Sequence, residues 1–213
     1  MQVFDNNNIC CELIKVGMLG TNCYVVYNKD SKVGCVIDPG GDSDKITAFI
    51  NANNLKIEYI YLTHGHFDHI MAAQEVKAKT GAKIAIFEKD AALALDSDAN
   101  CAYMMSLQLT MKADELLTDG QKVPFAGMFA KVINTPGHTA GSCCYYIEEM
   151  KVLFSGDTLF FECYGRTDLP TGSMSAMVHS IKDIVFELPE DVTAYPGHGA
   201  FTSIGYEKKN LDI

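Results

Sequence analysis

The chain has 213 residues, of which 48% are hydrophobic and 21% are charged, and its formal net charge at pH 7 is −10. These values are typical of one globular domain with a full hydrophobic core, and they exclude an intrinsically disordered chain. The negative charge also argues against nucleic acid as a general partner, because the phosphate backbone would be repelled.

In the first half of the chain, short apolar runs alternate with clusters of turn residues. This alternation predicts strands at 9–16, 22–27, 33–37, 57–62 and 83–87. A first helix is predicted from Asp42 or Ser43, either of which can cap it, to about residue 53. A second is predicted over 70–79, ended by Gly81. The pattern of residues 91–111 does not decide between helix and loop.

The second half repeats this succession of strands and helices. Strands are predicted at 121–125, 128–134, 142–148, 151–155 and 192–195. Helices are predicted over 173–187, with Ser173 as the cap, and over 203–211. No linker divides the chain. We therefore predict a single α/β domain spanning residues 1–213, in which two sheets pack face to face with helices outside.

Neither the beginning of the chain nor its cysteines point to export. Residues 1–8 contain no basic or apolar segment of a secretion signal, and no apolar run approaches the ~18 residues that cross a bilayer. The eight cysteines include no Cys-x-x-Cys pair, and several lie in apolar, strand-like runs. A reduced compartment explains them better than a disulfide framework. We expect a cytoplasmic protein without a membrane partner.

Residues 63–69 follow an apolar strand and hold three of the six histidines together with Asp68. Imidazole and carboxylate are the usual ligands of zinc and related divalent ions. In an extended loop, His64 and His66 can point to the same side. The adjacent Asp68 and His69 diverge, which suits two ions rather than one. This density of ligand-type residues predicts a metal site and argues against a merely solvated polar loop.

Three further candidates, His138, Asp157 and His198, share one context: each follows an apolar strand and has a glycine directly before it. A lone histidine in such a place is more often an ordinary side chain than a ligand. Together, however, these positions bring the number of candidates after strands to five histidines and two aspartates. The sixth histidine, His179, lies inside a predicted helix and is interpreted as an ordinary helix residue.

Four segments carry a resemblance to a known family: residues 63–69 (THGHFDH), 136–142 (PGHTAGS), 156–160 (GDTLF) and 196–199 (PGHG). In this order they resemble the metallo-β-lactamase superfamily. Residues 22–24 (NCY), 37–41 (IDPGG) and 165–170 (GRTDLP) are also similar to its glyoxalase II (hydroxyacylglutathione hydrolase) branch. The resemblance implies an αβ/βα four-layer sandwich, with two mixed β-sheets and helices on the outer faces.

The resemblance also implies how the candidate ligands divide. One ion would be held by His64, His66 and His138, and the other by Asp68, His69 and His198. Asp157 would bridge the two. We therefore expect two divalent ions per chain, with zinc as the first choice, although these donors also suit iron and manganese.

The function implied is hydrolysis of a thioester, that is, an S-acylated small thiol such as S-lactoylglutathione. A hydroxide bridging the two ions would attack the carbonyl carbon, and Asp68 and Asp157 would be the catalytic carboxylates, with Asp68 orienting the nucleophile. A thiolate leaves readily because the pKa of a free thiol is ~8.5, so that a dedicated general acid is dispensable.

Arg166 and Tyr164, on either side of Gly165, are the candidates for substrate recognition. In glyoxalase II a basic residue in a similar loop contacts glutathione, and Arg166 could bind a substrate carboxylate in the same way. The alternative is an internal Arg166–Asp168 ion pair that shapes the loop, and the sequence does not decide between them. Asp38, which precedes Pro-Gly, is interpreted as a turn residue rather than a catalytic one. The role of Cys163 and the oligomeric state stay open.

Departures from the family pattern narrow the function. The chain ends fifteen residues after His198, so we expect the C-terminal helical region of glyoxalase II to be absent. Asp157 occupies the place of the cysteine ligand of some true β-lactamases, which disfavours cleavage of antibiotics. Flavodiiron relatives have a glutamate at the position of His66, so the histidine in this chain excludes their pattern.

The main alternative is a persulfide dioxygenase, with a single iron held by His64, His138 and Asp157. A metal-binding module without catalysis, a lactonase and an RNA-processing hydrolase are further alternatives.

Overall fold

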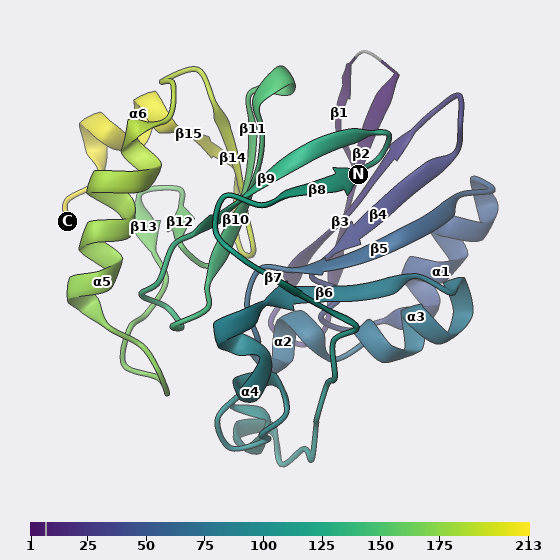
Figure 1. Cartoon of the computed structure of the whole chain (residues 1–213), viewed down its shortest axis with the longest axis horizontal. Helices are drawn as coiled ribbons and strands as arrows, with labels where there is room; N and C mark the ends of the chain where they lie inside the picture. The colour runs from purple at the N-terminus through teal and green to yellow at the C-terminus, as the bar shows by residue number, and fades with distance from the viewer. Residues whose placement is uncertain (7) are drawn as a thin grey trace.

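The computed structural model describes residues 1–6 and 8–213, which form two mixed β-sheets covered by helices (Figure 1). The first sheet runs in chain order through β1 (Gln2–Asn6), β2 (Ile9–Val16), β3 (Thr21–Asn28), β4 (Val33–Ile37), β5 (Lys56–Leu62), β6 (Lys83–Phe87) and β7 (Glu115–Leu117). The second has the order β15 (Thr202–Ser203), β14 (Thr193–Pro196), β11 (Val152–Gly156), β10 (Cys143–Ile147), β9 (Met128–Asn134) and β8 (Lys122–Phe125). A short hairpin pairs β12 (Leu159–Phe160) with β13 (Cys163–Tyr164).

Helices cover the outer face of each sheet. Figure 1 shows α1 (Ser43–Ala52) and α3 (Ala73–Thr80) outside the first sheet, and α5 (Met174–His179) and α6 (Ile204–Asn210) outside the second. The short helices α2 (Phe67–Ile70) and α4 (Ala91–Ala94) lie at one end of the first sheet. The αβ/βα four-layer sandwich expected from the sequence is confirmed.

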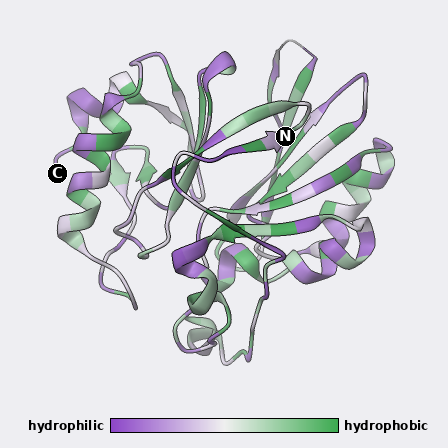
Figure 2. Cartoon of the chain, viewed as in Figure 1, coloured by the Kyte–Doolittle hydropathy of each residue, from purple (hydrophilic) through white to green (hydrophobic). Residues whose placement is uncertain are grey.

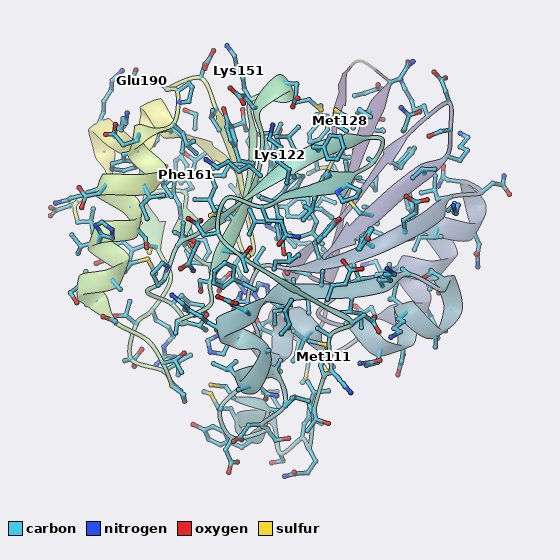
Figure 3. The ribbon with its side chains drawn as sticks, viewed as in Figure 1. Met111, Lys122, Met128, Lys151, Phe161 and Glu190 are labelled. Carbon is cyan, nitrogen blue, oxygen red and sulfur yellow. The ribbon has the colours of Figure 1, made fainter. Side chains whose placement is uncertain are left out.

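Three apolar clusters hold these layers together. The one between the sheets contains buried aromatic residues of both, among them Tyr61, Phe125 and Phe154. The second joins the outer face of the first sheet to α1 and α3, and the third joins the second sheet to its own helices. In β3, Tyr24 and Val26 belong to the central cluster, whereas Val25 and Tyr27 belong to the outer one. Hydrophobic residues accordingly recur along the strands (Figure 2), and side chains fill the space between the ribbons (Figure 3).

The strand directions bring several loops to one edge of the sandwich. In the first sheet β4, β5 and β6 are parallel, and in the second β11 is parallel to β14. The carboxyl ends of parallel neighbours lie at the same edge of a sheet, so the loops that follow them meet there. At this edge the sheets are joined directly, because Cys143 N donates to Thr63 O (2.9 Å) and Tyr145 Oη donates to Leu62 O (2.7 Å).

Most expected elements lie within one or two residues of their predicted bounds, but the helices differ in detail. The predicted helix 70–79 is two helices, α2 and α3, because Ala72 N donates to Pro39 O (2.9 Å) at the break between them. Of the predicted helix 173–187 only α5 is regular α-helix, and a wider π-helical turn and a tighter 3₁₀ turn follow it.

Two predicted caps had different outcomes. Ser173 caps α5 as expected, since its Oγ accepts from Ala176 N (3.3 Å). Asp42, one of the two residues predicted to cap α1, occupies its N-cap position, but its side chain makes no capping hydrogen bond and its carboxylate accepts from Gly17 N (3.1 Å) instead. None of the helices described is long and apolar enough to cross a bilayer.

The turn between β4 and α1 packs directly against the backbone of α2. A methyl group at Gly40 would overlap the carbonyl oxygen of Asp68, which is main chain and cannot rotate away. We expect Gly40→Ala to lower the free energy of unfolding by more than the roughly 1–3 kcal/mol of ordinary overpacking, as measured by denaturant titration.

Gly81→Ala is the control for this substitution. Its methyl group would meet nothing within 4 Å, so only the left-handed backbone at φ +75° opposes it, at a cost of about 1–2 kcal/mol. Equal losses in the two variants would contradict the close packing of this turn against α2.

Candidate metal centre

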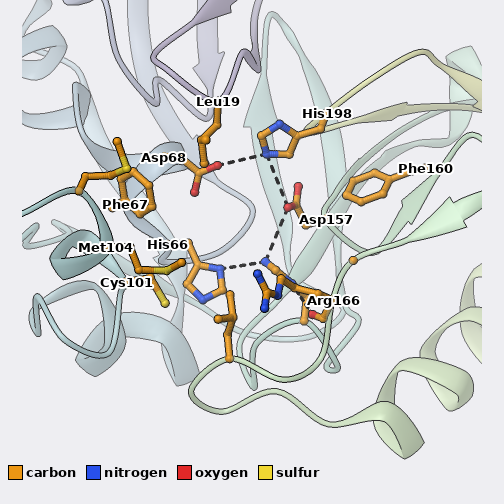
Figure 4. Close-up of a pocket in the computed structure, with 14 residues that line it drawn as sticks. Leu19, His66, Phe67, Asp68, Cys101, Met104, Asp157, Phe160, Arg166 and His198 are labelled. Atoms are coloured by element: carbon orange, nitrogen blue, oxygen red, sulfur yellow. Dashed lines mark hydrogen bonds and ion pairs between the residues drawn. The ribbon is translucent and has the colours of Figure 1, made fainter.

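All seven candidate ligands meet at the edge between the two sheets. His64 and His66 lie in the loop after β5, and Asp68 and His69 lie in α2. The other three follow β9, β11 and β14: His138, Asp157 and His198. Figure 4 shows residues from both sheets facing one another across the site. Six of the seven are buried, and His198 is partly exposed.

The donor atoms form two groups of three with Asp157 between them. In the first group, His64, His66 and His138 each offer one nitrogen within 4.8 Å of the others. In the second, a carboxylate oxygen of Asp68 and one nitrogen each of His69 and His198 lie equally close, and His64, His69 and Asp157 form a further such group that joins the two. His66 Nδ1 lies 2.8 Å from His138 Nε2. His198 Nε2 lies 3.1 Å from Asp68 Oδ2 and 3.3 Å from His69 Nε2.

Asp157 faces both groups. Its Oδ2 lies 3.6 Å from His138 Nε2, and its Oδ1 lies 3.4 Å from His69 Nε2. Two ligands of one ion, each about 2.0–2.1 Å from it, are roughly 2.9–3.4 Å apart. The distances of 2.8–3.3 Å found between donor atoms of the cluster are close to this value, so the geometry suits coordination of divalent metal.

Unpaired polar atoms support the same conclusion. Among the described residues, four buried side-chain polar atoms lack a hydrogen-bond partner, and three of them belong to this cluster: His64 Nε2, His66 Nε2 and Asp157 Oδ1. A buried polar atom without a partner lowers stability, and such atoms are rare in folded proteins. A cation bound between the two sets of donors would supply the missing partner of His64 Nε2 and Asp157 Oδ1.

The pKa values divide the histidines into two kinds. Burial lowers the pKa of His64 far below its ordinary value and that of His66 to about 3, so both rings are neutral, as metal ligands must be. Burial alone would also lower the pKa of His69, but Asp157, Asp68 and Asp38 outweigh it and raise the pKa to about 10. The carboxylates around His69 therefore favour a positive charge at this point, which a cation also provides.

Asp38 does more than form a turn. It is buried at the end of β4, and its carboxylate accepts from Thr63 N (2.8 Å), Thr63 Oγ1 (2.7 Å) and His69 Nδ1 (2.9 Å). Thr63 Oγ1 in turn lies 3.1 Å from His64 Nδ1. When the Nδ1 atoms are engaged in this way, the Nε2 atoms of both histidines are left to face the cluster.

Backbone carbonyl groups position the remaining rings. His138 Nδ1 donates to Arg166 O (2.7 Å), which turns its Nε2 toward Asp157. The loop that carries His198 is held by residues near the start of the chain. Asn22 Nδ2 and Tyr24 Oη both donate to Pro196 O, at 2.9 and 2.7 Å.

Asp90 is a residue of this site that the sequence reasoning missed. It follows β6, is fully buried, and accepts from Gly65 N (2.8 Å), Gly141 N (2.7 Å) and Thr139 Oγ1 (2.7 Å). It thus joins the loop between His64 and His66 to the loop after His138. Burial raises the pKa of Asp90, although these hydrogen bonds offset part of the effect. A carboxylate within three residues of the end of a predicted strand was the signal that could have indicated it.

A pocket of about 370 Å³ opens above the cluster. Five of the candidate ligands line it together with Arg166, and they are His66, Asp68, His138, Asp157 and the partly exposed His198. Arg166 lines the pocket, and its side chain forms the ion pair with Asp168 that was weighed as the alternative; its role in substrate recognition stays a prediction. Tyr164 is not among the described residues that line the pocket, and it pairs with Leu159 in the β12–β13 hairpin.

The cysteines do not form disulfides. All eight are free thiols, and seven of them are buried. Cys163 is exposed in the β12–β13 hairpin, whereas Cys101 is buried and lines the pocket.

Comparison with known proteins gives the same picture as the geometry. The family model described as the Metallo-beta-lactamase superfamily matches residues 16–198. The hydroxyacylglutathione hydrolase GloC of Haemophilus influenzae is 32% identical over 202 residues, which are 93% of this chain and 95% of that protein.

Three solved structures are similar over most of the chain. BLEG-1, described as a B3 metallo-beta-lactamase, is 35% identical with a TM-score of 0.88, covering 93% of this chain and 96% of that one. TTHA1623 in a di-iron-bound form is 29% identical with a TM-score of 0.83, covering 94% and 98%. ETHE1 from Myxococcus xanthus is 25% identical with a TM-score of 0.78, covering 94% and 82%.

We expect Asp90→Asn to weaken metal binding by about 10- to 100-fold, the usual effect of removing a group that orients the ligands. An amide cannot accept hydrogen bonds on both of its ends, so one of the two loops is released. Competition with a chromogenic chelator measures the affinity.

The control is Asp96→Asn. Asp96 lies in the same segment and accepts from Asp98 N (2.9 Å), but it is exposed and contacts neither loop. Wild-type metal affinity in Asp90→Asn, with an unchanged fold by circular dichroism, would contradict the role given to Asp90.

Proposed function

The chain belongs to the metallo-beta-lactamase superfamily and is a metallo-hydrolase of that group, and from this premise we propose that it hydrolyses thioesters of small thiols. The observation that carries the proposal is the group of buried, unpaired donor atoms beneath a pocket of small-molecule size. The name of the Haemophilus influenzae relative, a hydroxyacylglutathione hydrolase, supports a thioester as the substrate.

We assign the ligands as two sets. His64, His66 and His138 would hold one divalent ion, Asp68, His69 and His198 the other, and Asp157 would contact both. The di-iron-bound form of TTHA1623 supports a site for two ions. Zinc is our first choice of metal, and iron or manganese suits the same donors.

When bound, such ions lower the pKa of water and polarise a carbonyl group. The protein contributes position and charge. Asp68 accepts from Thr21 Oγ1 (3.4 Å) and lies against His198, so its carboxylate is fixed at the floor of the pocket, where it would orient the attacking water. Burial alone would raise the pKa of Asp68, but His69 and His198 outweigh it and keep the group ionised.

A thioester suits a pocket that offers few acids. Of the described residues that line it, the only carboxylic acids are Asp68 and Asp157, and both belong to the ligand cluster. A thiolate with a pKa of ~8.5 leaves without being protonated, whereas an amine does not. We further propose that residues 1–213 act as one cytoplasmic catalytic domain on a small molecule, without a nucleic-acid partner.

Hydrolysis of a β-lactam is a second candidate, favoured by the description of BLEG-1 as a B3 metallo-beta-lactamase at 35% identity. Some β-lactamases have a cysteine ligand at the position of Asp157, and the aspartate disfavours β-lactam hydrolysis of their kind. It does not argue against the activity of lactamases that lack this cysteine. A chromogenic cephalosporin in the same assay separates the two hydrolytic activities.

We expect S-lactoylglutathione and simpler acyl thioesters to be cleaved by the metal-loaded protein, and Asp157→Ala to lower kcat/KM at least about 100-fold, because it removes a group shared by both ions. Release of free thiol measures the rate. The control is His179→Ala, which removes the exposed last residue of α5, paired with Asp183 in the turn that follows, and should leave the rate unchanged. Full metal content and activity in Asp157→Ala would contradict its assignment.

We expect two ions per chain in the wild type and one in His198→Ala, measured by elemental analysis after equilibrium dialysis. The loss follows because His198 belongs only to the second group. A persulfide dioxygenase would instead hold a single iron through His64, His138 and Asp157 and would consume oxygen with glutathione persulfide. One ion in both proteins, with such oxygen consumption, would favour that alternative.

A further inference from the structure

The wall of the pocket above the cluster is strongly apolar. Six of its residues are hydrophobic and come from five separate segments: Leu19, Phe67, Met104, Met105, Phe160 and Leu169. Figure 4 shows Leu19, Phe67 and Met104 on one side of the ligands and Phe160 on the other. Leu19 and Met104 are more than half exposed, at 53% each, so apolar surface continues to the mouth of the pocket. Such a surface is suited to an apolar group of a ligand.

This wall is an integral part of the fold. Phe67, which stands between the ligands His66 and Asp68, packs in one buried cluster with Cys101 and Ala102, and Met105 and Leu169 pack against it. Phe67 N also donates to Asn100 O (2.9 Å). Methionine side chains adapt to different apolar shapes, so this wall can accommodate a flexible chain.

Arg166 is the one basic side chain other than histidine among the described residues that line the pocket, and its charge is already paired. Its Nε and Nη2 atoms donate to the two carboxylate oxygens of Asp168, each at 2.7 Å. This fork-to-fork contact uses the same donors that would bind a carboxylate of glutathione.

Both side chains of this ion pair are exposed, at 56% and 68%, so the pair is weak and can open. A substrate carboxylate gains little from the opening, however. It must share the guanidinium with Asp168 or displace it, and in either case a second negative charge stays beside it. The net charge of −10 adds a general repulsion of anions.

On the premise of the thioester hydrolysis proposed above, we propose that this pocket selects apolar acyl groups carried on uncharged thiols, and that the Arg166–Asp168 pair disfavours glutathione thioesters. The substrate class is therefore an aliphatic acyl thioester whose thiol presents no carboxylate. Arg166 contributes its carbonyl group to the position of His138, and its side chain contributes to selectivity through Asp168.

Four thioesters test the proposal: acetyl and hexanoyl groups, each on N-acetylcysteamine and on glutathione. Burial of a methylene group favours binding about fourfold, so hexanoyl should exceed acetyl by at least about tenfold in kcat/KM. With the same acyl group, N-acetylcysteamine should exceed glutathione about fivefold or more. Uncleavable S-hexyl thioethers of the two thiols, titrated by calorimetry, should show the same order of affinity without any turnover.

Variants test the Arg166–Asp168 ion pair and the apolar wall separately. Asp168→Asn should raise the glutathione to N-acetylcysteamine ratio about fivefold, and the gain should shrink as salt is added, because these charges are exposed. The matched control is Asp191→Asn, which breaks the exposed pair with Lys151 at the end of β11 remote from Asp157 (Figure 3). It should leave the ratio unchanged. Met104→Gln, at an exposed position, should lower the hexanoyl to acetyl ratio.

The outcomes separate this inference from the proposed function. Cleavage of none of the four thioesters, with the expected order of thioether affinities, would overturn the proposed function and support the selectivity of the pocket. Cleavage with glutathione preferred, or with acetyl equal to hexanoyl, would overturn the inference and support the function. An unchanged ratio in Asp168→Asn would overturn the role of the ion pair.

Discussion

Burial of five imidazoles and two carboxylates at one edge between two sheets is the constraint on which the rest of the structure depends. Polar groups removed from water need partners, and in this cluster several donor atoms have none among the described residues. The surrounding fold holds the rings with their nitrogens directed at one another. The arrangement of loops at this edge is thus explained by the binding of metal cations to these donor atoms.

Two buried carboxylates keep the loops in register without contributing to either group of donors. Asp38 joins the end of β4 to Thr63 and His69, and Asp90 joins the loop before His66 to the loop after His138. Asp38 directly follows β4 and Asp90 ends the 3₁₀ turn after β6, so the parallel run β4–β5–β6 supplies ligands and their supports from one edge of the sheet. Rigid placement of this kind is what a site needs if it is to bind ions without rearrangement.

The sequence was sufficient to predict the strands, the four-layer architecture and the seven residues that converge, because each lies within a few residues of the end of a strand, in a short loop or, for Asp68 and His69, in the first turn after it. The role of Asp90 was not predicted, because it arises only from contact with loops 25 and about 50 residues away in sequence. The division of the helix after His69 depends on the carbonyl group of Pro39, which is likewise distant. Residues 91–111 take their shape from packing against Phe67, and no local periodicity encodes that contact.

The attachment of the His198 loop to the strand that begins near Asn22 has a consequence for biosynthesis. Asn22 N donates to Gly197 O (2.7 Å), so this contact closes nearly the whole length of the chain. The first group of donors is complete once residue 138 has been translated, and the second only once residue 198 has followed. On the ribosome, a growing polypeptide therefore contains all donors of the first group some sixty codons before it contains those of the second.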